Sequence, residues 1–253
     1  MRIMRSTNPV FRGIKGNEVF STSNSATYGG ITSKTFLLFL IAVTTGYFTA
    51  TNVEFVLSNS WIMLVSMIAA FVCVMISSIN PRAAKIFAPL YAAFEGMLLG
   101  TIILFISTLS TVSTAYEGIV LNAVLITLSI FLVMLLLYST GAVRVGPMFR
   151  RVMMGALFGL ILFTFSTFII GIFSPGFREM IYGNMQLMLL VSLISAALAS
   201  LFILIDLDNC TKLVQASAPK EYEWVASLGL MVTIIWLFLE ILRILIIFAS
   251  RRD

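Results

Sequence analysis

The sequence predicts an all-α polytopic membrane protein, and two observations indicate this class. Of the 253 residues, 60% are hydrophobic and only 11% are charged, whereas roughly a quarter of the residues in a soluble domain are charged. The apolar residues also form long continuous runs, while a transmembrane barrel would show short segments of alternating polarity. The chain therefore predicts a bundle of membrane-spanning helices.

Seven apolar runs are long enough to cross a bilayer, which takes about 20 residues per helix. They cover residues 35–53, 57–79, 86–109, 118–141, 152–174, 183–212 and 224–249. Little chain remains between them, so we expect one seven-helix transmembrane domain over residues 34–253 and no separate soluble domain. Residues 1–33 are polar and basic, and we interpret them as a loosely ordered cytoplasmic tail.

Lysine and arginine alternate between the loops, as the positive-inside rule requires. The basic residues gather in the N-terminal segment and after the second, fourth and sixth runs: Arg2, Arg5, Arg12, Lys15, Lys34, Arg82, Lys85, Arg144, Arg150, Arg151, Lys212 and Lys220. The N-terminus is thus predicted to be cytoplasmic, and seven crossings put the C-terminus outside, although Arg251 and Arg252 run against the rule there. Because this orientation explains the net charge of +5, we expect no nucleic-acid partner.

Carboxylates inside predicted spans are the strongest indication of function, because an ionisable group at that depth is costly and marks a functional site by default. Glu240 lies in the last run on one helical face with Thr233, Trp236 and Arg243, at spacings of three and four residues. That face is expected to look into the bundle. Arg243 is a candidate charge partner for Glu240, and a fixed link between these two side chains is the competing structural interpretation.

Two aspartates lie late in the sixth run, and a helix would point them about 200° apart. Asp206 shares a face with Ser195 and is predicted to be buried, whereas Asp208 is closer to Lys212 and is predicted to be a solvated cap. Asp208 is also a candidate pore-lining residue.

The third run holds another carboxylate, Glu95, one helical turn after Tyr91. Both are candidate pore-lining residues. The pairs Gly96–Gly100 and Gly155–Gly159 have the small-residue spacing that lets helices approach closely, so we expect both pairs to lie at helix contacts.

A low-dielectric site favours the neutral form of a carboxyl group, and two carboxyl groups that share a site also share a proton. The sequence therefore indicates a switch in which protonated Asp206 and Glu240 hold helices together. Loss of the proton would introduce repulsion and attract a cation. The chain has no histidine, so carboxylates must carry any proton sensing.

Three segments resemble the Bax inhibitor-1 family in its bacterial branch: "YAAFEG" in the third run, "ILIDLDN" late in the sixth, and "APKEYEWVASLGLMVTIIWLFLEILRIL" leading through the seventh. The "TNPVF" near the N-terminus is similar as well. The resemblance implies seven helices with the last one central, in the bacterial cytoplasmic membrane. It also implies a pH-sensitive calcium leak.

The resemblance further implies a proton-sensing pair of acidic residues, which fall on Asp206 and Glu240. The glutamate departs from the usual pair of aspartates. The family's latching arginine has its nearest match in Arg82, within "SINPRAAK".

The first functional hypothesis is a cation leak channel gated by the carboxylate pair, which would bind calcium weakly and transiently at Asp206 and Glu240. The second is a regulator without transport activity that binds membrane proteases or cell-death and stress factors. We expect no enzymatic activity and no cofactor. The expected partners are the lipid bilayer, calcium ions, protons and, under the second hypothesis, membrane proteins.

Overall fold

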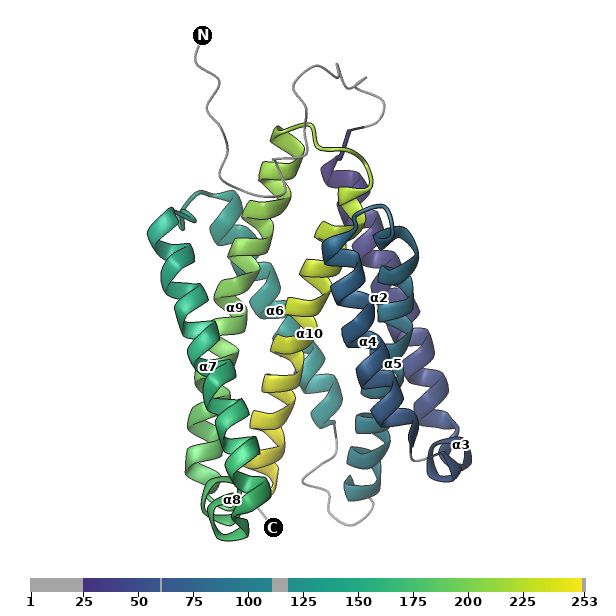
Figure 1. The fold of residues 1–253 in the computed structure, drawn as a ribbon, viewed down its shortest axis with the longest axis vertical. Coiled ribbons are helices and arrows are strands. Elements are labelled where there is room, and N and C mark those ends of the chain that lie inside the picture. Colours follow the sequence, from purple (N-terminus) through teal and green to yellow (C-terminus); the bar gives the residue numbers. More distant parts are fainter. Residues whose placement is uncertain (1–24, 60, 111–117, 252–253) are drawn as a thin grey trace.

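The computed structural model describes residues 25–59, 61–110 and 118–251, and this part of the chain is a bundle of helices (Figure 1). The helices are α2 (Tyr28–Thr51), α3 (Val53–Ser58), α4 (Trp61–Ile79), α5 (Ala84–Ser110), α6 (Ile119–Ser139), α7 (Pro147–Phe173), α8 (Pro175–Tyr182), α9 (Met185–Gln215) and α10 (Tyr222–Ala249). The expectation for the tail at residues 1–24 lies outside the described residues.

Within these ranges, six helices are long and apolar enough to span a bilayer: α2, α5, α6, α7, α9 and α10. The second predicted run forms α4, whose apolar stretch Met63–Ile79 is shorter. The all-helical prediction is therefore confirmed for the described residues.

Local signals explain most of the helix ends. α4 stops at Ile79, directly before Asn80–Pro81, because a residue that precedes proline avoids the helical conformation. Pro147 starts α7 at the position where a missing amide hydrogen does no harm. The Asn184 side chain accepts a hydrogen bond from the amide of Leu187 and so caps α9.

The start of α2 differs from the prediction, since this helix begins at Tyr28 rather than at residue 35. The Thr27 hydroxyl accepts a hydrogen bond from the amide of Gly30, at 3.0 Å, and caps the helix. Residues 28–33, which were expected in the tail, are therefore the first turns of α2. Just before them, the amide of Ala26 donates to the carbonyl of Ala218 at 2.7 Å.

The bundle has two ends that differ in charge. The starts of α5, α7 and α10 and the ends of α4 and α9 meet at one end, the upper one in Figure 1. We call this the basic end because its loops and helix termini carry Arg82, Lys85, Arg144, Lys212 and Lys220. The opposite end holds α3, α8 and the end of α10, and we call it the far end.

α10 has the largest buried share of the six long helices: 56% of its apolar window is buried, against 11% for α7. It packs against α2, α4, α5, α6 and α9. Each of the three clusters of buried apolar side chains among the described residues includes residues of α10, for example Met231, Leu237 and Leu230. α10 thus joins the two halves of the core.

The contact between α2 and α5 is close enough to need glycine. A Cβ atom on Gly96 would lie 2.3 Å from the carbonyl oxygen of Ala42, and one on Gly100 would lie 2.4 Å from that of Gly46. The predicted packing role of Gly96 and Gly100 is therefore confirmed. The same prediction is wrong for Gly155 and Gly159 in α7, where a Cβ would meet nothing within 4 Å among the described residues, because that face of α7 has no neighbouring helix.

Candidate functional site

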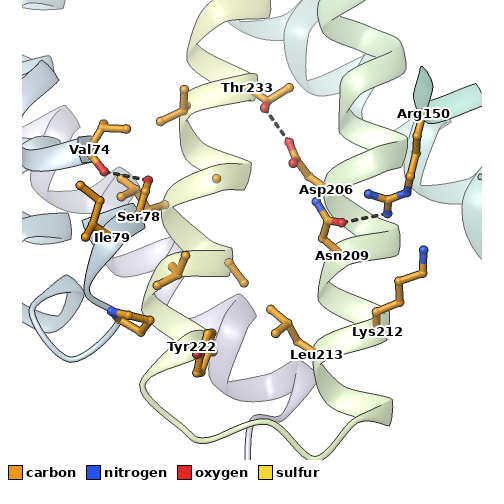
Figure 2. Close-up of a pocket in the computed structure, with 16 residues that line it drawn as sticks. Val74, Ser78, Ile79, Arg150, Asp206, Asn209, Lys212, Leu213, Tyr222 and Thr233 are labelled. Atoms are coloured by element: carbon orange, nitrogen blue, oxygen red, sulfur yellow. Dashed lines mark hydrogen bonds between the residues drawn. The ribbon is translucent and has the colours of Figure 1, made fainter. Parts of the chain in front are cut away.

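Asp206 lines a cavity of about 1080 Å³ that lies between α4, α7, α9 and α10 near the basic end (Figure 2). Its Oδ2 accepts a hydrogen bond from the Thr233 hydroxyl at 2.6 Å. The two side chains point toward one another from α9 and α10. A carboxyl group thus links these helices across the cavity wall.

The wall is mixed in polarity. Polar groups come from every contributing helix, including Ser78 of α4, Arg150 of α7 and Asn209 of α9, while Val74, Leu228 and Val232 are among the apolar residues. Figure 2 shows Arg150 reaching from α7 toward Asn209, and its Nη2 donates to the Asn209 side chain at 2.8 Å. Such a wall can hold water or an ion beside Asp206.

Asp208 forms an ionic triad at the same end of the bundle. Its Oδ2 pairs with the guanidinium of Arg150 and, at 2.6 Å, with the ammonium of Lys212. The Asp208 side chain is only 15% exposed. The prediction of a solvated cap is therefore wrong, because Arg150 from α7 and Lys212 one turn later cover this carboxylate.

Glu240 belongs to a second polar network, on the other side of the midpoint of α10. It is 7% exposed. Its Oε1 accepts from the Ser195 hydroxyl at 2.9 Å, and its Oε2 accepts from Arg243 at 3.2 Å. Trp236 in turn donates from its indole nitrogen to the Ser195 oxygen at 3.1 Å.

The structure does not bring Asp206 and Glu240 into direct contact with each other. Their contact points on α10, Thr233 and Glu240 itself, are seven residues apart, which is about 10 Å along a helix. The two networks nevertheless share one property: each carboxyl group joins α9 to α10. The shared-proton role of this pair stays a prediction.

The other predicted site residues lie outside the cavity. Arg82 is exposed beyond the end of α4, where its amide donates to the Asn80 side chain at 3.2 Å. Tyr91 is buried in the core with Leu228, and Glu95 lies beside its hydroxyl. The latch and pore-lining roles of these three residues stay predictions.

Sequence reasoning missed two residues. The alternation of basic residues predicts only a loop charge at Arg150, although Arg150 is the cation that α7 presents to the cavity and to Asp208. Glu223 was not singled out, yet it is fully buried and pairs with Lys34. The sequence did offer a signal for this pair. Glu223 is an acidic residue in the first turn of α10, and Lys34 is a basic residue early in α2.

These observations define a polytopic α-helical membrane protein that buries the carboxylates of Glu223 and Glu240 inside the bundle. The model of the Bax inhibitor 1 like family matches residues 8–250, and the chain belongs to this family. Among curated proteins, no relative matches the chain.

Proposed function

We propose that the protein is a pH-sensitive cation leak channel, with calcium as the permeant ion, in which Asp206 and Glu240 act as proton-dependent links between α9 and α10. The observation that carries the proposal is the position of Asp206: a titratable carboxyl group lines a large cavity and at the same time bonds to the neighbouring helix. Its protonation state can therefore change both the charge of the cavity and the contact between the helices.

The proposal includes a topology of seven crossings, with α4 as the shortest and α10 as the central helix. The basic end faces the cytoplasm, so the N-terminus is inside and the C-terminus outside a bacterial cytoplasmic membrane. The alternation of basic residues between loops supports this orientation. The packing of α10 against α2, α4, α5, α6 and α9 supports its central place.

Protonation is proposed to favour the closed form. A neutral Asp206 has no charge to attract a cation, and it can still share a hydrogen bond with Thr233. An ionised Asp206 offers a hard oxygen ligand, and the oxygens of Thr233 and Ser78 in the cavity wall are neutral ones. A single carboxylate with neutral oxygens binds calcium weakly, which suits an ion that must also leave.

Glu240 is proposed as the second link, nearer the far end. Arg243 balances the charge of its carboxylate, and Ser195 of α9 donates a hydrogen bond to it. Glu240 therefore stabilises the pairing of α9 with α10 at a point closer to the far end than Asp206. The two carboxyl groups then need no direct contact to act on the same helix pair.

Removal of the Asp206 charge tests the channel directly. We expect the purified protein in liposomes to pass calcium faster as the pH rises, and we expect Asp206→Asn to lower this flux by about tenfold and to weaken its pH dependence. A calcium-sensitive dye inside the liposomes measures the flux. The control is Glu179→Gln, which removes an exposed carboxylate of α8 and should leave the flux unchanged.

Two outcomes of this assay count against the channel. Wild-type protein that passes no calcium at any pH would support the second hypothesis, a regulator that binds membrane proteases or cell-death and stress factors. Flux that is equal in wild type and Asp206→Asn would show that the cavity does not carry the ion.

The ionic triad gives a second prediction. Asp208→Asn leaves Arg150 and Lys212 without their shared counter-charge beside the cavity, and like charges repel a permeant cation. We expect calcium flux to fall about tenfold in Asp208→Asn and to recover in the double variant Asp208→Asn, Arg150→Gln. A double variant that stays as slow as the single one would contradict the electrostatic explanation.

A further inference from the structure

A groove of about 530 Å³ lies near the far end between α7, α8, α9 and α10, apart from the Asp206 cavity. Its apolar wall is one face of α7, with side chains that recur every three or four residues: Leu157, Leu160, Ile161, Phe165 and Phe168. Ile161, Phe165 and Phe168 are each more than half exposed. The groove is therefore open on the side where a membrane protein meets lipid.

The opposite wall of the groove is polar, and it holds Glu240, Ser195, Trp236 and Arg243. Arg243 uses one guanidinium nitrogen to donate to Glu240 at 3.2 Å. Its side chain is 48% exposed, and within the described residues this is the one hydrogen bond that it makes. A guanidinium has five N–H donors, so most of its donors remain available toward the groove.

The depth of Arg243 matches the phosphate layer of a bilayer. α10 has 28 residues and is about 42 Å long, while the hydrocarbon core is about 30 Å thick. If the helix extends equally on both sides, about 6 Å protrudes at the far end. Arg243 lies six residues, or about 9 Å, before that end, so its backbone is about 3 Å inside the hydrocarbon and its side chain reaches the headgroups.

The length of the groove matches one leaflet. Phe168 and Leu157 are eleven residues apart on α7, or about 16 Å, and one leaflet of the hydrocarbon core is about 15 Å deep. The cationic end and the apolar end thus have the spacing of a lipid headgroup and its acyl chain.

We propose that this groove binds one glycerophospholipid, with its phosphate on Arg243 and an acyl chain along the α7 face. The planar guanidinium donates to phosphate oxygens in pairs, and such charge-assisted bonds are strong. Glu240 takes one guanidinium nitrogen of Arg243, and its other oxygen accepts from the Ser195 hydroxyl, so the remaining N–H donors of Arg243 are the ones that bind the phosphate. The bound lipid fills the gap between α7 and the rest of the bundle, where α7 makes few buried contacts.

Native mass spectrometry of the purified full chain, titrated with phosphatidylglycerol, tests the site. Phosphatidylglycerol is the probe because its headgroup has no positive charge to compete with Arg243. We expect the affinity for the first bound lipid to fall about tenfold in Arg243→Gln, as the loss of a charge-assisted hydrogen bond implies. The matched control is Arg178→Gln in α8, an exposed arginine at the same end of the bundle, which should bind like wild type.

A second variant tests the groove without touching the arginine. Thr164 lines the groove from α7, and Thr164→Trp should fill the space and weaken the first lipid about as much as Arg243→Gln does. Thermal unfolding in detergent verifies that each variant is folded. The proposal is overturned if wild type binds no phosphatidylglycerol, if Arg243→Gln or Thr164→Trp binds like wild type, or if Arg178→Gln is as weak as Arg243→Gln.

Discussion

Replacing Gly96 by alanine is expected to destabilise the protein by about 3 kcal/mol, because overpacking a close helix contact forces the backbones apart. The new methyl carbon would lie 2.0 Å from the Thr45 hydroxyl oxygen and 2.3 Å from the Ala42 carbonyl oxygen. The second of these atoms belongs to the backbone of α2 and cannot turn away. The free energy of unfolding, measured by titration of the detergent-solubilised protein with sodium dodecyl sulfate, gives the effect.

Gly155 provides the matched control for this substitution. It lies inside α7, where a Cβ would meet no atom of the described residues within 4 Å. Gly155→Ala should leave stability unchanged or raise it by about 0.5 to 1 kcal/mol, the usual advantage of alanine over glycine within a helix. Equal losses in the two variants would show that the contact between α2 and α5 is looser than described.

The second large effect on stability is expected at Glu223, whose side chain connects the start of α10 to the start of α2. Its side chain is fully buried and pairs with Lys34, which is 16% exposed. It also accepts hydrogen bonds from the Thr27 amide at 2.9 Å and from the Thr27 hydroxyl at 3.1 Å. Gly30 makes room for it, since a Cβ there would lie 2.1 Å from Oε1 of Glu223.

Glu223→Leu is expected to lower the free energy of unfolding by about 3 to 5 kcal/mol, because it leaves Lys34 without its partner in a desolvated site. The same denaturant titration measures this loss. The double variant Glu223→Leu, Lys34→Met removes both charges and should regain part of the stability, since an apolar pair often replaces a buried ion pair at little cost.

Glu221→Leu is the matched control for Glu223, because Glu221 is an exposed carboxylate two residues earlier. It should change stability by no more than about 0.5 kcal/mol. A double variant less stable than Glu223→Leu would contradict the view that the unpaired lysine is the source of the loss.

The helices that cross the bilayer could be predicted from sequence because hydrophobicity is a local property. The run at residues 118–141 became α6 at Ile119–Ser139, and the run at 183–212 became α9 at Met185–Gln215. The short helices α3 and α8 and the early start of α2 were missed. Their residues are not apolar enough to signal a span, and the start of α2 depends on a cap at Thr27 and on a distant partner, Glu223.

The polar residues of the site were found because charge is rare in a span, but their partners were not. Helical spacing places Asp206 and Ser195 on one face, yet Ser195 bonds to Glu240 and Asp206 bonds to Thr233. Which side chains meet depends on how α9 and α10 are offset along their axes, and a single sequence carries no information on that offset. The two glycine pairs illustrate the same limit: identical spacing gives a tight contact at Gly96 and an open face at Gly155.

The helices of the bundle are packed unevenly: α10 is tightly packed with α2, α4 and α5, whereas α7 is loosely packed. α2 and α5 meet backbone to backbone, and buried aromatic and aliphatic side chains join α4 and α10 to them. α7 instead contacts α9 through a few side chains, and Arg150 forms an ion pair with Asp208 of α9. Segments with few buried contacts are the first to open. A force within the membrane plane would therefore displace α7 before it separates α2, α4, α5 and α10.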